Sequence, residues 1–323
     1  MVDNIILFLM QIKGMSRKTL YKYFQFVEPG EYSLGDVQLL IKEAALNTRK
    51  INIPSLSDLD NVYEKYENIL CRSQDLGIQI TSYLDKQFPV KLRNIDDPPA
   101  IIYTLGDLGC MDKSAVAVIG TREPIEYGAK IADNLGYVLG RDGYTVVSGL
   151  AYGCDKFGHE GCLRSGGKTV AVMAGGLDKV YPAKHKELAK AIVESGGCLM
   201  SEYPVNTRTF QSNFVERDRL QSGLSEGIIV VETDLKGGTW HTIEFAKKNQ
   251  RSVGCYVHPD KYLTEKKTFG NQKLLKEGGV FGIKTNDDLK MYKQLIDEKH
   301  LELVKTTEEV KAVQTSFIEQ IGG

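Results

Sequence analysis

The stretch from Ala115 to Tyr127, which reads AVAVIGTREPIEY, places the strongest constraint on the fold. Its unbroken run of small and β-branched residues ends abruptly at Gly120, which is typical of a strand buried on both faces of a parallel sheet. Pro124 then opens an amphipathic stretch, so we expect this proline at an early position of a helix. Gly120, Thr121 and Arg122 are therefore predicted to form the turn between a first strand and its crossover helix. Because helix amides at such a turn favour an anion, the guanidinium of Arg122 indicates a phosphate.

Strand and helix patterns alternate through the middle of the chain. The expected strands are Ala115 to Ile119, Tyr144 to Ser148, Thr169 to Met173, Cys198 to Ser201, Gly227 to Glu232 and Ser252 to Val257. The expected helices are Tyr127 to Leu139, Asp155 to Arg164, Lys184 to Glu194, Phe214 to Leu224 and Thr239 to Lys248. This alternation predicts an α/β fold with a doubly wound, mostly parallel sheet and right-handed crossovers. Its ligand should lie beyond the carboxyl ends of the strands.

Glycine usage separates the front of the chain from the middle. Only four of the 32 glycines precede Gly106, whereas 26 lie between Gly106 and Gly282. Residues 3–47 have the pattern of short helices, one of them N-capped by Ser16, and a longer helix is expected from Leu56 to Leu76. Two short strands, Ile78 to Thr81 and Ala100 to Leu105, are expected before the main sheet. We predict a helical N-terminal domain over residues 1–76, a main domain over 77–284, and a C-terminal helix from Asn286 to about Val304 with a tail over the rest of 285–323.

The turns after the strands carry the candidate binding residues. We predict that Arg122, the Gly175-Gly176 turn, Arg217 or Arg219, and Gly238-Thr239 line one anion-binding pocket, because all of them lie at strand ends. The other candidate phosphate- or DNA-binding residues are Gly120, Thr121, Ser148, Gly149 and Phe214. Arg217 and Arg219 are two positions apart and cannot share one helical face, so one of them is expected to pair with neighbouring carboxylates instead. Phe210 and Phe214 suit either the core or a surface on which a base stacks.

Several other patterns have a structural and a functional interpretation. Ile12 to Ser16 resembles a helix–hairpin–helix turn, whose amides can contact DNA phosphates, but Ser16 stands where the motif has its second Gly, which favours a plain helical packing module. Asp155 and His159 suit an acid–base pair or, more simply, a helix cap with a packed histidine. Cys154, His159 and Cys162 lack metal-site spacing, so no metal is expected. The six cysteines form no CxxC pair and are expected to be reduced thiols.

Composition excludes several functional classes. The net charge of −1 and the pI near 6.5 mean that any nucleic-acid site must be a local basic pocket. No apolar run is long enough to cross a membrane and no signal peptide is recognisable, so we expect a cytoplasmic protein with no membrane partner. GxSxG and P-loop motifs are absent, which leaves acyl transfer and ATP hydrolysis without support. We expect no enzymatic activity, no catalytic residue and no cofactor.

Several motifs follow one another along the chain. In order they are VAVIGTR, VVSGLAYGCDKFGHEGCLRSGGKTVAVMAGGLDKVYP, SEYP and FVERDRLQSGLSEGIIVVET, flanked by FPVKLRNIDDPPAIIY and GNQKLLKEGG. Together they resemble the DprA/Smf family of DNA-processing proteins. The resemblance covers residues 80–290 and implies an extended Rossmann-like domain that binds single-stranded DNA without enzymatic activity. It also implies a homodimer that protects DNA and loads a RecA-type recombinase in DNA uptake, recombination or repair.

The resemblance also assigns site residues and shows departures from the family. The family's Gly-Ser-Arg phosphate loop falls on Gly120-Thr121-Arg122, and its Arg-Asn-Arg stretch falls on Arg217-Asp218-Arg219. Asp218 therefore stands where the family has Asn, and Tyr152 stands where it has Arg. The family's Ser-Gly-Arg or Ser-Gly-Ser stretch is Gly237-Gly238-Thr239 here, and the C-terminal region is shorter than the winged-helix domain that many members carry.

A second class of protein shares the sheet and the glycine-rich turns. It comprises nucleotide-ligand proteins, namely phosphoribohydrolases of the LOG type and nucleotide-sensing SLOG domains. The hydrolases use a PGGxGTxxE stretch, whereas this chain has KGGTWHTIEF, with Phe245 at the matching Glu position. Hydrolysis is therefore disfavoured, and a nucleotide sensor in signalling or defence is the alternative function.

Overall fold

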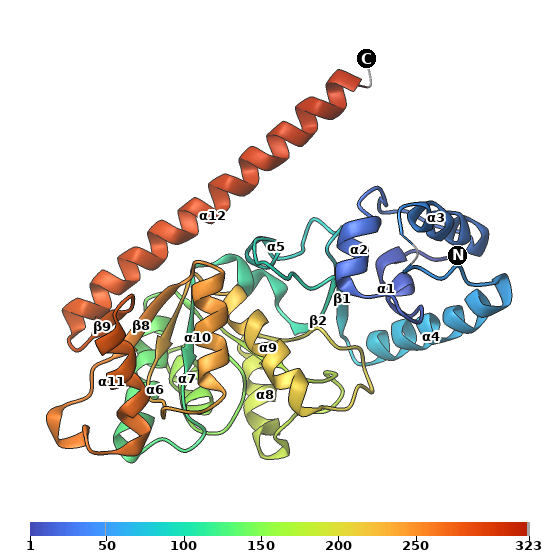
Figure 1. The fold of residues 1–323 in the computed structure, drawn as a ribbon. Coiled ribbons are helices and arrows are strands. Elements are labelled where there is room, and N and C mark those ends of the chain that lie inside the picture. Colours follow the sequence, from blue (N-terminus) through green and yellow to red (C-terminus); the bar gives the residue numbers. More distant parts are fainter. Residues whose placement is uncertain (49, 322–323) are drawn as a thin grey trace.

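The computed structural model describes the backbone of residues 1–48 and 50–321 and the side chains up to Lys305 within those ranges. In this part of the chain one nine-stranded sheet crosses the molecule (Figure 1). The strands are β1 (Gln79–Ser82), β2 (Ile101–Gly106), β3 (Ala115–Ile119), β4 (Thr145–Ser148), β5 (Thr169–Met173), β6 (Cys198–Ser201), β7 (Gly227–Val230), β8 (Ser252–Tyr256) and β9 (Phe281–Ile283). Every strand expected from the sequence is present within two residues of its expected ends, and β9 is an additional strand.

The sheet is mostly parallel and doubly wound, as predicted. Its order is β1-β2-β6-β5-β4-β3-β7-β8-β9, and only β2 runs antiparallel to its neighbours β1 and β6. The chain moves outward from β3 through β4, β5 and β6, and then returns to place β7 on the other side of β3. The strand order therefore reverses between β3 and β7, which is where open α/β sheets bind their ligands.

Helices cover both faces of the sheet. On one face lie α6 (Glu126–Arg141), α7 (Cys154–Arg164) and α8 (Lys186–Glu194), and on the other lie α9 (Gln211–Gly223), α10 (Thr239–Lys248) and α11 (Phe269–Glu277). Alternate residues of β3 serve the two layers: Val116 and Val118 pack in the cluster of α6, while Ala117 packs in the cluster of α9 and α10. All five residues of β3 are buried, which explains its unbroken apolar sequence.

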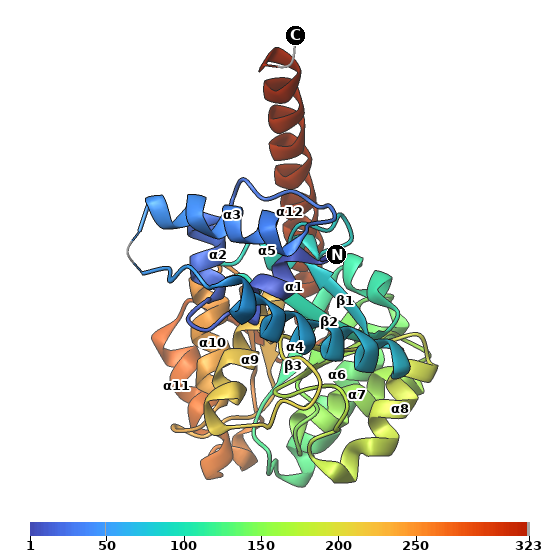
Figure 2. The ribbon, with the colours of Figure 1, turned by 90° about the vertical axis from the view of Figure 1, so that its right-hand side faces the viewer.

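Four helices precede the sheet and pack on its β1–β2 edge (Figure 2). They are α1 (Ile5–Met10), α2 (Arg17–Tyr23), α3 (Leu34–Leu46) and α4 (Leu56–Asp75), and a short α5 (Val90–Arg93) follows β1. Ser16 caps α2 as expected, since its side chain accepts a hydrogen bond from the amide of Thr19. One apolar cluster includes Phe8 and Tyr66 from these helices together with Tyr103 of β2. The N-terminal helices thus share a core with the sheet, and a domain boundary at residue 76 stays a prediction, like the one at residue 284.

The C-terminal helix is longer than the sequence pattern indicated. Helix α12 spans Asn286–Ile321 and projects away from the body of the molecule (Figure 1). Its first turns are anchored because Tyr292 is buried and its hydroxyl donates to the carbonyl oxygens of Ile228 and Ser252. The expected end near Val304 reflects the loss of apolar spacing, but the following Lys, Glu, Gln and Ala residues keep a high helix propensity.

Two smaller expectations need correction. Helix α6 begins at Glu126 with Ile125 as its N-cap, so Pro124 precedes the helix. Helix α9 begins at Gln211, three residues before the expected start at Phe214. No helix in residues 1–48 or 50–321 is long and apolar enough to cross a bilayer.

Candidate functional site

A cavity of about 490 Å³ opens where the strand order reverses. We call it the switch-point cavity. Its walls come from the turn after β3, the start of α7, one side of α9, the loop after β7 and the start of α10. The predicted site residues that line it are Gly120, Thr121, Arg122, Phe214, Arg217, Gly238 and Thr239.

The Gly-Thr-Arg turn is held on both sides by its neighbours in the sheet. The amide of Thr121 donates to the carbonyl oxygen of Glu232 after β7 (2.7 Å), and its carbonyl oxygen accepts from the amide of Cys154 at the start of α7 (3.1 Å). The buried carboxylate of Glu232 also accepts from the amide of Ile125, the N-cap of α6 (2.9 Å). The turn is therefore fixed before any ligand arrives, and Arg122 extends from a rigid base.

Arg217 is buried and packs against the turn after β4. Its side chain is 5 % exposed, and it donates to Gln221 Oε1 (3.0 Å) and lies beside the carboxylates of Asp155 (3.8 Å) and Asp218 (3.3 Å). A Cβ atom on Gly149 would lie 1.1 Å from Arg217 Nη1, so only glycine permits this approach. The glycine at position 149 thus accommodates a side chain of the protein and not a ligand.

The charges on the cavity wall balance one another. Four basic side chains (Arg122, Arg217, Lys236 and Lys267) face four acidic ones (Glu123, Asp155, Asp218 and Asp234). Burial raises the pKa of Asp218 to about 6, although Arg217 opposes this shift. Burial also raises the pKa of Asp155. The cavity as a whole therefore has no excess of positive charge, and an anion must be bound by particular unpaired groups.

Arg122 and Lys236 are the unpaired basic groups of the cavity. Within the described side chains neither makes an ion pair, whereas Lys267 pairs with Glu123 (3.6 Å) and Arg217 pairs as above. Arg122 is exposed and its guanidinium lies 5.3 Å from the centre of the Phe214 ring. Lys236 directly precedes the Gly237-Gly238 turn. The sequence analysis missed Lys236, although a lysine beside a glycine-rich turn was a usable signal.

Phe214 lines the cavity on the side of α9. Phe214 is partly buried and packs against Tyr181, with ring centres 5.7 Å apart, so it is not a core residue. Phe210 and Tyr181 are 62 % and 56 % exposed. A ring beside a cationic group suits base stacking, which favours that interpretation of Phe214, whereas Phe210 is exposed outside the cavity lining.

Four of the predicted residues lie away from the cavity lining. Ser148 is buried and donates to the carbonyl oxygen of Val118 (2.7 Å), and Gly149 is covered by Arg217. Gly175 packs against Thr209 and Gly176 against Pro204, in the loop after β6. The prediction that the Gly175-Gly176 turn lines the pocket is wrong, because β5 lies two strands from β3, about 10 Å away.

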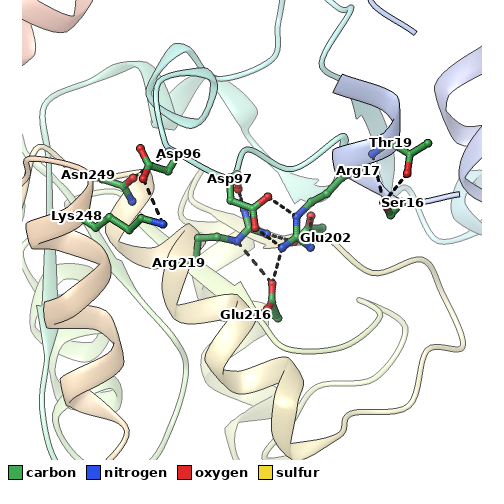
Figure 3. Close-up of polar contacts among 10 residues, drawn as sticks. All are labelled: Ser16, Arg17, Thr19, Asp96, Asp97, Glu202, Glu216, Arg219, Lys248 and Asn249. Atoms are coloured by element: carbon green, nitrogen blue, oxygen red, sulfur yellow. Dashed lines mark hydrogen bonds and ion pairs between the residues drawn. The ribbon is translucent and has the colours of Figure 1, made fainter. Parts of the chain in front are cut away.

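Arg219 also lies outside the cavity, on the opposite side of α9 from Arg217. Its guanidinium pairs with Glu202 and donates to the carbonyl oxygen of Asp97 (Figure 3). Arg17 at the start of α2 shares Glu202 (3.7 Å) and Glu216 (2.8 Å) with Arg219, and it also pairs with the carboxylate of Asp97 (2.6 Å). As the spacing indicated, Arg217 faces the cavity and Arg219 does not, but both arginines pair with carboxylates, so the expectation that one of them would do so instead of the other is wrong. Arg219 is therefore a contact between the sheet and the N-terminal helices.

Of the two interpretations of Asp155 and His159, the structure supports the packed histidine, but Asp155 is not the helix cap. His159 is fully buried, and a hydrogen bond joins its Nδ1 to Thr169 Oγ1 (2.7 Å). Burial lowers the pKa of His159 to about 3. Asp155 does not cap α7, whose N-cap is Gly153; its carboxylate accepts from the amides of Gly149 (3.1 Å) and Ala151 (3.4 Å). Asp155 thus shapes the turn after β4, and His159 joins α7 to β5. All six cysteines are free thiols, and only Cys71 is exposed.

Comparisons with known proteins agree with this geometry. The family model for DNA recombination-mediator protein A matches residues 79–293. The DNA processing protein DprA of Bacillus subtilis is 34 % identical over 198 residues, which are 61 % of this chain and 66 % of that protein. The matched segments span between 43 % and 66 % of the length of three curated relatives.

Two solved structures are similar over most of their length. The DNA processing protein A of Streptococcus pneumoniae has a TM-score of 0.73 at 26 % identity, covering 90 % of this chain and 97 % of that one. The DNA processing protein A of Helicobacter pylori, described in a single-stranded DNA binding mode, has a TM-score of 0.57 at 27 % identity, covering 71 % of this chain and 96 % of that one. With the family model matching well over half of its residues, the chain belongs to the DNA recombination-mediator protein A family, also called DprA or Smf.

Proposed function

We propose that this chain binds single-stranded DNA at the switch-point cavity and acts as a recombination mediator without enzymatic activity. The observation that carries the proposal is the state of Arg122. It is an exposed guanidinium on a rigid turn at the strand-order reversal, and no described carboxylate pairs with it. The similar Helicobacter pylori protein binds single-stranded DNA, which supports the same ligand here.

The geometry suits a phosphodiester with its base. Arg122 and Lys236 supply charge for a phosphate, and Gly238 and Thr239 at the start of α10 line the same space. Phe214 offers a ring for stacking, which is tolerant of sequence. Protection of DNA, formation of a homodimer and loading of a RecA-type recombinase in DNA uptake, recombination or repair belong to the same proposal and rest on the family.

The alternative is a nucleotide sensor. The cavity volume of about 490 Å³ lies in the range of small-ligand sites, which favours a mononucleotide as a second candidate ligand. A mononucleotide would use the same phosphate groups, so competition between the two ligands is informative.

The test is fluorescence anisotropy of a labelled oligo-dT strand over a salt series. We expect Arg122→Ala to weaken binding and to lower the slope of log affinity against log salt by about 0.7, the value for one lost phosphate contact on a single strand. Arg141→Ala is the matched control, because Arg141 is 57 % exposed at the far end of α6. Absence of DNA binding, with saturable binding of a mononucleotide, would favour the sensor. An unchanged salt slope in Arg122→Ala would remove this cavity from the DNA site.

A further inference from the structure

Asp218 is the unusual group of the cavity. Its side chain is 11 % exposed, it lines the space beside Arg122, and its Oδ1 lies 3.3 Å from Arg217 Nε. Arg217 already faces the carboxylate of Asp155 at 3.8 Å. Two buried carboxylates thus face one buried guanidinium, and this group of three carries one excess negative charge when both carboxylates are ionised.

A phosphate entering the cavity adds another negative charge at close range. Two unit charges about 5 Å apart repel by about 3 kcal/mol at the dielectric that describes partly buried sites. The repulsion disappears when Asp218 is protonated, because the carboxylic acid is neutral and its hydroxyl can donate to a phosphate oxygen. Every DNA phosphate that enters therefore favours the protonated form of this side chain.

The other charged groups around Asp218 do not remove this effect. Arg122 from the turn after β3 and His241 from α10 face Asp218 and favour its ionised form, as does Arg217 on α9 itself. Asp155 on α7 opposes them. Asp234 and Lys236, both described residues of the loop after β7, line the cavity with opposite charges but form no ion pair with each other, and Lys267 is paired with Glu123. Burial outweighs these influences and raises the pKa of Asp218 to about 6 before any phosphate is present.

We propose that Asp218 makes phosphate binding at the switch-point cavity proton-coupled, so that the site takes up a proton when single-stranded DNA enters and binds it more tightly in mildly acidic than in neutral solution. This inference rests on the proposed function and adds its regulation. The sign follows from linkage. If the pKa of a carboxyl is higher in the complex than in the free protein, the affinity for the ligand is highest at low pH and falls as pH rises above the pKa of the free protein.

The test is the same anisotropy measurement from about pH 5.5 to about pH 8 at constant ionic strength, a range in which neither thymine nor a phosphodiester titrates. If the ionised carboxylate excludes the phosphate, affinity in the wild type falls by about tenfold per pH unit above about pH 6. Asp218→Asn keeps the shape and removes the charge. It should bind as tightly at neutral pH as the wild type does in acid, and its affinity should change little with pH.

Two controls separate this mechanism from others. Asp60→Asn makes the same charge change at an exposed site on α4 and should keep the wild-type pH dependence. Histidine is the residue type that ordinarily titrates in this range, so His241→Gln tests the neighbouring imidazole and should also keep a steep dependence. A pH dependence that survives in Asp218→Asn, or that disappears only in His241→Gln, would overturn the proposal. Binding by the wild type without any pH dependence would refute proton coupling alone, whereas no binding even in acid would refute the DNA site as well.

Discussion

Arg17 is expected to hold the N-terminal helices against the sheet, and its removal gives a quantitative test of that contact. Its guanidinium donates to both oxygens of Asp97 (2.9 and 2.6 Å) and to Glu216 (2.8 Å), and it lies 3.7 Å from Glu202 (Figure 3). These carboxylates belong to the segment before β2, to α9 and to the end of β6. The contact therefore joins α2 to three distant parts of the chain.

The size of the expected stability loss follows from how exposed the ion pair between Arg17 and Asp97 is. The side chains of Arg17 and Asp97 are 23 % and 24 % exposed, between a surface pair and a buried one. A surface pair contributes up to about 1 kcal/mol, and breaking a buried pair costs about 3–5 kcal/mol. We expect Arg17→Ala to lower the free energy of unfolding by about 2–3 kcal/mol, because Asp97 would lose its ion pair and Glu202 and Glu216 would keep only the guanidinium of Arg219.

Urea unfolding at neutral pH measures this loss. Arg17→Lys keeps the charge without the two-pronged contact and should lose about half as much. Arg72→Ala, an exposed arginine on α4, is the control and should change stability by less than about 0.5 kcal/mol. Because Phe8, Tyr66 and Tyr103 share one apolar cluster, a single cooperative transition is expected in each variant.

The loss should also depend on pH. The hydrogen bond from Arg17 holds the pKa of Asp97 below its usual value, so this contribution is fully present above the pKa of the unfolded chain and is lost as pH falls through the lower pKa of the folded protein. Burial raises the pKa of Glu202, so the charge that Arg17→Ala leaves with Arg219 as its remaining partner is neutralised on acidification. A loss below about 0.5 kcal/mol at neutral pH, or one that grows in acid, would refute the assignment of Arg17 as the contact that holds the two parts together.

Two further predictions concern buried carboxylates. Burial raises the pKa of Asp218 from 3.8 to about 6, so its ionised carboxylate destabilises the folded protein above pH 6. Asp218→Asn should therefore increase the free energy of unfolding by as much as about 3 kcal/mol above pH 6 and leave it unchanged near pH 4. Urea unfolding at both pH values measures this difference, and an equal gain at both would contradict the cause. Glu226 is fully buried and binds Lys91 (3.1 Å) and His300 of α12 (2.8 Å), so Glu226→Gln should cost about 3–5 kcal/mol by leaving Lys91 unpaired. Amide hydrogen exchange in the first turns of α12 should accelerate with it, and unchanged protection there would show that His300 does not anchor the helix.

The sequence predicted the elements well because each carries its own pattern. Strand β3 is uniformly apolar and ends in a glycine turn, and α10 begins at Thr239 as the Gly-Gly-Thr pattern indicated. The assembly of the site needed more than local patterns. Strand order decides which turns meet, and it placed Gly120 and Gly238 at the cavity but Gly175 two strands away. That order depends on long-range pairing, which no segment of the sequence contains by itself.

Side-chain partners were the second unpredictable part. The spacing of Arg217 and Arg219 required opposite directions, but it did not say which arginine faces the cavity. The answer depends on Asp155 and Gln221 on one side of α9 and on Glu202, Asp97 and Arg17 on the other, and four of these five residues lie far from α9 in sequence. The acidic partners therefore had to be placed in space before the two arginines could be distinguished.

The basic residues of the cavity have two different roles, which depend on whether their charges are already paired. Arg217 is buried and faces two carboxylates while fixing the turn after β4, so it shapes the site and adds no net attraction for an anion. Arg122 and Lys236 are exposed and free of described ion pairs, so they provide the charge that a phosphate would neutralise. Counterion release reports only contacts with the phosphate itself. The slope of log affinity against log salt concentration therefore distinguishes the two kinds of arginine. Substituting a residue that shapes the site lowers affinity equally at every salt concentration, whereas substituting a residue that binds phosphate changes the slope.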